Sequence, residues 1–291
     1  MNSLNTDDPI SASGAHFKSE YISVSDDVKL KVLQWQSKTK DPKKAVGSVI
    51  FVSGWVSHVS GWAELLSSMT QNRRVFYIET REKISAHIKK KNICVNDFTV
   101  ANIAVDIINI CKSLPIDLEK SIVMGSSFGA TALLEALKNN NLNVRCAFFV
   151  GPNSEFSAHP FMKTLLYLPD FSYHFLKYFV LWYLRTFRVD AKKEPEQMDR
   201  YKITIKTAHP RRIKMSVKAA MKYKLWPDLE TVQIPTALAY APTDTLHSKD
   251  NIKKIAQTLP RGQIIACPTN KYMHSADLLK DIEGFIKNSK I

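Results

Sequence analysis

Two glycines frame a serine between an apolar run and a helix-like segment. Residues 125–129, Gly-Ser-Ser-Phe-Gly, follow the apolar run 121–124 and precede residues 130–137, which are typical of a helix. This pattern predicts a strand, a sharp turn and a helix, with the central residue of the turn in a strained backbone conformation. Glycines two residues to either side let the strand and the helix approach without a Cβ clash. Only Ser127 has glycine at both of these positions.

Strands and helices are expected to alternate along most of the chain. Residues 21–35 alternate like a β-hairpin, with Asp26-Asp27 at the turn. Short apolar runs predict further strands at residues 48–52, 75–78, 121–124, 144–150, 236–241 and 263–267. Helical spacing predicts helices at residues 62–70, 100–114, 130–137, 251–259 and 276–286. The alternation predicts an α/β protein whose mostly parallel sheet carries helices on both faces and functional residues at the strands' C-terminal ends.

An acid and a histidine follow the last two predicted strands. Asp244 lies on the loop after the first of these strands, and His274 lies on the loop after the second. Asp250, at the start of the next helix, and Glu155, after an earlier strand, are alternative acids that rank below Asp244. We therefore expect Asp244 and His274 to meet the serine at one edge of the sheet.

The order of serine, acid and histidine resembles the triad of the α/β-hydrolase superfamily, over residues 21–286. The turn around Ser127 matches the nucleophile elbow of that superfamily. The resemblance implies that His274 takes the proton of Ser127, while Asp244 fixes the histidine tautomer and stabilises the imidazolium.

Two backbone amides are expected to form an oxyanion hole. The resemblance assigns them to Phe128, directly after the nucleophile, and to Trp55, on the loop after strand 48–52. The family usually has His-Gly at residues 53–54, where this chain has Ser-Gly, and residues 79–83 replace an Asp and a Gly-rich turn. The alternative for the Trp55 loop is a plain turn from strand to helix.

A helical cap is expected at residues 153–225, between the predicted strands that end near 150 and begin near 236. α/β-hydrolases commonly carry such an insertion at this place. Its first half is strongly aromatic, and Phe179 and Trp182 are candidates to line an apolar acyl site. Ordinary packing of a cap helix is the alternative. Charged and polar residues interrupt the run, so that a membrane span is not expected.

The second half of the predicted cap is basic. Residues 200–224 contain nine Lys and Arg and no acidic residue, in a chain of formal net charge +14. Arg211, Lys214 and Lys218 fall on one face of a predicted helix. An anionic partner would be attracted to this face, although a solvated charged face is an equal alternative. An acidic acyl carrier protein, a coenzyme A thioester or an anionic membrane surface would fit, whereas no motif indicates nucleic acid.

Composition agrees with one large domain that has a polar N-terminal tail. The chain has 291 residues, 45% of them hydrophobic, and can bury a sizeable core. Residues 1–20 form the expected tail, which lacks the basic start and apolar stretch of a signal peptide. Four scattered cysteines show neither metal nor disulfide spacing, which favours reduced thiols and a cytoplasmic location.

These features predict a serine hydrolase that cleaves a carboxylic ester or thioester with an apolar acyl group. The resemblance implies no metal or organic cofactor. Residues 53–55 and the basic cap also resemble pimeloyl-acyl carrier protein methyl ester esterases, which implies an acyl carrier substrate and a role in biotin synthesis. Lysophospholipase, thioesterase and acyltransferase activities are alternatives. A non-catalytic hydrolase-fold protein that binds a lipid or a protein is the alternative from another class.

Overall fold

The structure is a computed structural model of the whole chain. It describes residues 8–12, 14–38, 47–55, 57–157, 166–169, 172–183, 185–186, 203, 208–244 and 246–289. Parts of the predicted N-terminal tail and of the predicted cap lie outside these residues. No helix within the described ranges is long and apolar enough to cross a lipid bilayer.

Within the described residues, nine strands form one sheet at the centre of the molecule. Its main path runs in the order β1-β2-β4-β3-β6-β7-β8-β9, and the short β5 pairs with β2. The first two strands form an antiparallel hairpin and β2 also runs antiparallel to β4, whereas every pairing from β4 to β9 is parallel. The strands are β1 (Phe17–Ser25), β2 (Val28–Trp35), β3 (Val49–Val52), β4 (Val75–Ile78), β5 (His87–Ile88), β6 (Ile122–Ser126), β7 (Cys146–Val150), β8 (Thr236–Tyr240) and β9 (Gly262–Ala266).

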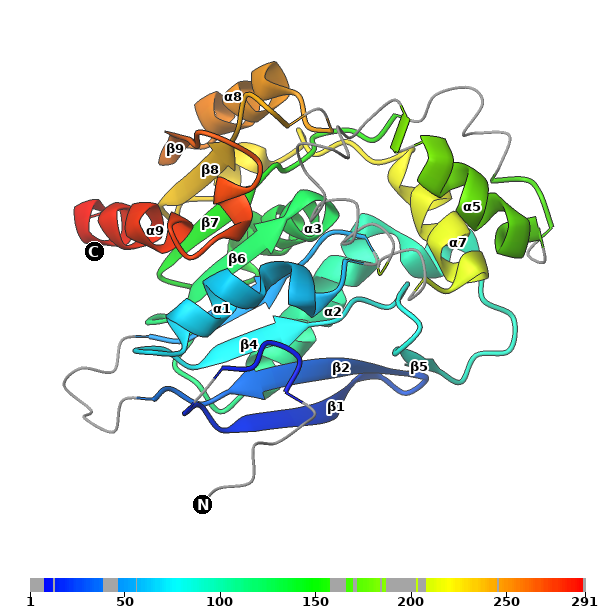
Figure 1. Cartoon of the computed structure of the whole chain (residues 1–291), viewed down its shortest axis with the longest axis horizontal. Coiled ribbons are helices and arrows are strands. Elements are labelled where there is room, and N and C mark those ends of the chain that lie inside the picture. Colours follow the sequence, from blue (N-terminus) through cyan, green and yellow to red (C-terminus); the bar gives the residue numbers. More distant parts are fainter. Residues whose placement is uncertain are drawn as a thin grey trace.

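Helices cover both faces of this sheet (Figure 1). The α-helices are α1 (Ala63–Met69), α2 (Val100–Ser113), α3 (Ser127–Leu137), α5 (Tyr173–Tyr183), α7 (Pro210–Ala220), α8 (Lys249–Thr258) and α9 (Leu278–Asn288). Short 3₁₀ helices are η1 (Val59–Trp62), η2 (Val95–Phe98), η3 (Lys138–Asn140), η6 (Leu229–Thr231) and η7 (Tyr272–His274).

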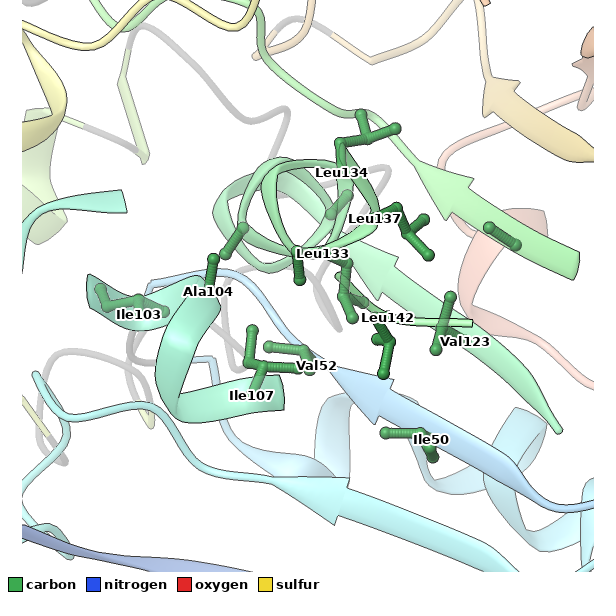
Figure 2. Packing of buried hydrophobic residues seen from close by; sticks show 14 of the residues in the cluster. Ile50, Val52, Ile103, Ala104, Ile107, Val123, Leu133, Leu134, Leu137 and Leu142 are labelled. Atoms are coloured by element: carbon green, nitrogen blue, oxygen red, sulfur yellow. The ribbon is translucent and has the colours of Figure 1, made fainter. Parts of the chain in front are cut away.

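The side chains of β3 point alternately to the two faces of the sheet, and this alternation produces two apolar layers. Ile50 and Val52 face the cluster that includes residues of α2, α3 and α8. Val49 and Phe51 face the opposite cluster, which includes residues of α1 and α9. Successive strand side chains point to opposite faces, so a strand buried on both sides must be apolar throughout. Figure 2 shows the first cluster, where side chains of α2 and α3 pack over Ile50, Val52 and Val123.

The helices α5 and α7 belong to the interval between β7 and β8 that was predicted as a cap. They lie at the opposite end of the molecule from the C-terminus (Figure 1). Pro210 occupies the first helical position of α7, where its missing N–H costs no helical hydrogen bond. The boundaries of core and cap at 153 and 225 stay a prediction.

Candidate active site

A strained turn places Ser127 at the junction of β6 and α3. Its φ is +48°, in the left-handed region that residues other than glycine rarely adopt. A Cβ added at Gly129 would lie 2.3 Å from the carbonyl oxygen of Val52, and one at Gly125 would lie 2.9 Å from the amide nitrogen of Ala130. The predicted strand, sharp turn and helix are therefore present, and the two glycines are required by close backbone approach.

Asp244 lies after β8 and is paired with His247. Its Oδ2 is 2.7 Å from Nδ1 of His247, and its Oδ1 accepts hydrogen bonds from the amides of Leu246 at 2.9 Å and His247 at 3.3 Å. Burial raises the pKa of Asp244, but the hydrogen bonds and charge of His247 and the two amides outweigh it, so that the pKa lies below its usual value. Asp244 is therefore an ionised carboxylate that is held by its own loop.

His274 occupies the end of η7 and makes different contacts. Its Nδ1 lies 3.2 Å from the carbonyl oxygen of Gly61, and its ring packs on Trp62 with 4.1 Å between ring centroids. Because a carbonyl oxygen can only accept, the proton is assigned to Nδ1, which leaves Nε2 as the basic nitrogen. Gly61 thus fixes the tautomer that a general base for Ser127 requires.

The resemblance implied that Asp244 orients His274, and the contacts in the structure differ from that arrangement. The carboxylate binds His247, and Nδ1 of His274 binds the Gly61 carbonyl instead. His247 follows Asp244 by three residues on the same loop. The entropic cost of closing this contact is therefore small. His247 is not among the residues predicted from the sequence. Its short spacing from Asp244 was the available signal, but the strand-order pattern used to find His274 passes over it.

A cavity of about 300 Å³ brings the candidate residues together. Its lining includes Ser127, Asp244, His247 and His274, as well as Gly54 and Trp55 of the loop after β3. Ser127, Asp244 and His274, which are far apart in the sequence, thus border one cavity. Their roles as nucleophile, acid and base stay a prediction. The alternative acids lie elsewhere. Glu155 forms an ion pair of 2.5 Å with Lys224, and Asp250 is exposed in the first turn of α8.

The loop after β3 lies against the elbow. A Cβ at Gly54 would lie 3.2 Å from Cβ of Ser127, and the Gly54 amide donates to Oγ of Ser126 at 3.1 Å. The Trp55 indole stacks on Phe128 at 4.5 Å between centroids. Phe128 belongs to the first turn of α3, whose amides have no carbonyl partner within the helix. Both predicted donor residues therefore flank the serine, while their role as oxyanion donors stays a prediction.

The predicted cap residues lie outside the residues that border the cavity. On α7, Lys214 donates to the carbonyl of Leu168 at 2.6 Å, Lys218 lies 4.3 Å from the ring centroid of Tyr167, and Arg211 reaches the carbonyl of Ile93 at 3.5 Å.

On α5, Phe179 and Trp182 have ring centroids 5.4 Å apart and are 38% and 52% exposed. The role of these two residues in acyl binding stays a prediction.

No family model and no curated protein matches this chain by sequence. Solved structures match it closely in shape. The enol-lactonase from Burkholderia xenovorans LB400 has a TM-score of 0.73 at 13% identity and covers 92% of this chain and 100% of its own. A thermophilic esterase from Thermogutta terrifontis has a TM-score of 0.72 at 12% identity and covers 94% of this chain and 100% of its own. Est816, described as an N-acyl homoserine lactone degrading enzyme, has a TM-score of 0.71 at 12% identity and covers 91% of this chain and 99% of its own.

Proposed function

This chain has the α/β-hydrolase fold, as the sequence predicted, and we propose that it is a serine hydrolase that cleaves a carboxylic ester or thioester. One observation carries the proposal. Ser127 is held at φ +48° on a strand-to-helix turn, and it borders the same cavity as an ionised carboxylate and two histidines. A nucleophile, a base and an acid within one cavity are the requirements of acyl transfer to serine.

The proposed reaction proceeds in two halves. Oγ of Ser127 attacks the substrate carbonyl while Nε2 of His274 accepts its proton, and the amides of Phe128 and Trp55 stabilise the oxyanion. The protonated histidine then gives that proton to the leaving alcohol or thiol. Water attacks the acyl-enzyme in the second half, with the histidine again as base, and releases the acid. The ionised Asp244 supplies a negative charge to the cavity that favours the imidazolium.

A second arrangement of the base has its own support. The contact of 2.7 Å between Asp244 and His247 is the carboxylate-to-Nδ1 contact that a catalytic histidine needs. In this arrangement, His247 takes the serine proton and His274 shapes the cavity. The two arrangements use the same nucleophile and the same acid, so they predict the same reaction and differ only in which histidine is essential.

Several classes of ester fit the proposed reaction. The aromatic residues Trp55 and Trp62 border the cavity and favour an apolar acyl group. Two similar structures are described as an enol-lactonase and as a lactone-degrading enzyme, and a lactone is a cyclic ester. An acyl carrier protein ester, which the resemblance implies, would use the basic residues of α7. Lysophospholipase, thioesterase and acyltransferase reactions share the acyl-enzyme and differ in leaving group or acceptor.

Labelling with a fluorophosphonate tests the proposal, combined with hydrolysis of p-nitrophenyl esters of increasing chain length and of a lactone. We expect the wild-type protein to be labelled and Ser127→Ala to lose both labelling and at least about 10⁴-fold in kcat. Ser126→Ala is the matched control. It removes the acceptor for the Gly54 amide and should reduce activity far less. Near-normal turnover in Ser127→Ala would contradict Ser127 as the nucleophile. Absence of labelling in the wild-type protein would favour a non-catalytic binding protein.

A further inference from the structure

A buried lysine holds the two ends of the loop that carries Trp55. Nζ of Lys83 donates to Oγ of Ser53 at 2.9 Å and to the carbonyl oxygen of Ser57 at 2.8 Å, and lies 3.4 Å from the hydroxyl of Tyr77. The Tyr77 hydroxyl lies 2.6 Å from Oγ of Ser53 and donates to the Ser57 carbonyl at 2.9 Å. One ammonium group and one phenol therefore join residues 53 and 57.

This arrangement joins the two places where the sequence departs from the family pattern. Lys83 belongs to residues 79–83, and its ammonium group reaches Ser53, where the family usually has a histidine. Ser53 is fully buried and Lys83 is only 5% exposed. Burial lowers the pKa of Lys83, but the neighbouring groups of Tyr77, Glu79 and Glu82 raise it above its ordinary value. The lysine therefore stays a cation, which is strongly unfavourable in a buried site without acceptors such as these.

The segment that carries Lys83 is itself fixed from two sides. Arg81 forms hydrogen bonds of 2.5 and 2.6 Å with the two carboxylate oxygens of Asp106 in α2. On the other side, Arg212 of α7 donates to the carbonyls of Lys83 at 2.9 Å and Ala86 at 2.8 Å. The backbone from which the lysine extends is thus anchored to both the core and α7.

The helix α7 also holds the loop directly. Nε1 of Trp55 donates to Oγ of Ser216, a buried residue of α7, at 2.9 Å. Residues 212 and 216 lie one helical turn apart, so one face of α7 contacts both the Lys83 segment and the Trp55 side chain. The loop is consequently held at its two ends by Lys83 and at its centre by α7.

We infer that Lys83 is a positioning residue that sets the Trp55 amide opposite Ser127 for stabilisation of the oxyanion. This inference rests on the proposed serine hydrolase function. Lys83 lies outside the residues that border the cavity and acts through Ser53 and Ser57. The oxyanion exists only in the transition state and the tetrahedral intermediate, so a displaced donor lowers kcat and leaves KM nearly unchanged.

The test compares Lys83→Met, which removes the donors, with Lys83→Arg, which keeps a cation and N–H donors. Lys89→Met is the matched control, because Lys89 is exposed and follows the same segment. The kcat for hydrolysis of a p-nitrophenyl ester is calculated per fluorophosphonate-labelled site, so that unfolded protein does not lower the value. We expect Lys83→Met to lose about 10²-fold in kcat with KM within about twofold, and Lys83→Arg to recover part of that loss. Lys89→Met should match the wild-type protein.

Where Lys83→Met fails to fold, Ser53→Ala is measured instead, because it keeps the lysine. It removes only the Ser53 hydroxyl, which accepts from Lys83, lies 2.6 Å from the Tyr77 hydroxyl and donates to the Ser57 carbonyl at 3.3 Å. It should lower kcat by a smaller factor, again without raising KM. A wild-type kcat per labelled site in Lys83→Met, or in Ser53→Ala where the lysine variant does not fold, would overturn the inference and leave the proposed function intact. A purely structural role would instead lower the melting temperature and the number of labelled sites together. A wild-type protein that neither labels nor hydrolyses esters would remove the proposed function, and the inference with it.

Discussion

Two histidines border the cavity with Ser127, and they differ in how their rings are held. Asp244 pairs with His247, whereas the Gly61 carbonyl orients His274. Either environment places the ring proton on Nδ1 and leaves Nε2 as a base. Position after the last strand favours His274, and contact with the carboxylate favours His247.

We expect His274→Ala to lose about 10²–10⁴-fold in kcat, the usual contribution of a general base. His247→Ala should lose less than about tenfold, since it only frees the Asp244 carboxylate. His87→Ala is the control, because His87 is exposed and lies on β5, away from the cavity. Steady-state hydrolysis of a p-nitrophenyl ester measures all three variants. The opposite ranking of His274 and His247 would assign the base to His247.

The junction of β6 and α3 depends on two glycines because the backbone of other segments lies too close for a Cβ. The elbow could be predicted because the Gly-x-Ser-x-Gly spacing reports a local backbone requirement that no distant contact can replace. The start of β1 at Phe17 could not, since residues 17–20 are mostly polar on an edge strand that is open to solvent. The two-residue β5 was missed because it is too short to show alternation.

Two glycine substitutions should therefore change the free energy of unfolding in opposite directions. Gly129→Ala places a methyl group 2.3 Å from the Val52 carbonyl oxygen and should lower the free energy of unfolding by at least about 1–3 kcal/mol and abolish activity. Gly284→Ala, in the middle of α9, places the new Cβ more than 4 Å from any atom outside the adjacent residues and the helix's own backbone, and should raise the free energy of unfolding by about 0.5–1 kcal/mol. Urea unfolding measures both. Equal destabilisation by the two substitutions would contradict the close approach at Gly129.

The order of strands along the chain is enough to expect Ser127, Asp244 and His274 near one edge of the sheet, because parallel strands end at a common edge. Solved structures of the same fold are only 12–13% identical to this chain, so the fold does not depend on most of its particular side chains. The partner of Asp244 could not be predicted in this way. It depends on the path of a single loop, in which Asp244 closes on the amides of Leu246 and His247.

The basic side chains of α7 allow a test of the partner. Arg211, Lys214 and Lys218 changed to glutamate should leave hydrolysis of a short neutral ester unchanged, because none borders the cavity. If the true substrate is carried by an acidic protein or an anionic surface, kcat/KM for that form should fall in the variant. In the wild-type protein it should also fall with added salt, as the Debye length shortens to about 10 Å near 0.1 M.

A second triple variant controls for net charge. Lys112, Lys253 and Lys287 are exposed on α2, α8 and α9, and their change to glutamate alters the total charge equally. Similar small losses in both triple variants, without salt dependence, would mean that the basic side chains of α7 are only solvated.

The interval between β7 and β8 also has a consequence for synthesis. β7 pairs with β8 in register, from Ala147 opposite Thr236 to Val150 opposite Ala239, yet residues 151–235 are made between them. At a translation rate of about 5–20 residues per second, the edge of β7 that pairs with β8 stays unpaired for on the order of 5–15 s. An apolar strand with unpaired backbone groups readily joins other chains during such a delay. The nascent chain should therefore depend on chaperones until β8 emerges, and slow translation of the interval should lower the yield of folded protein.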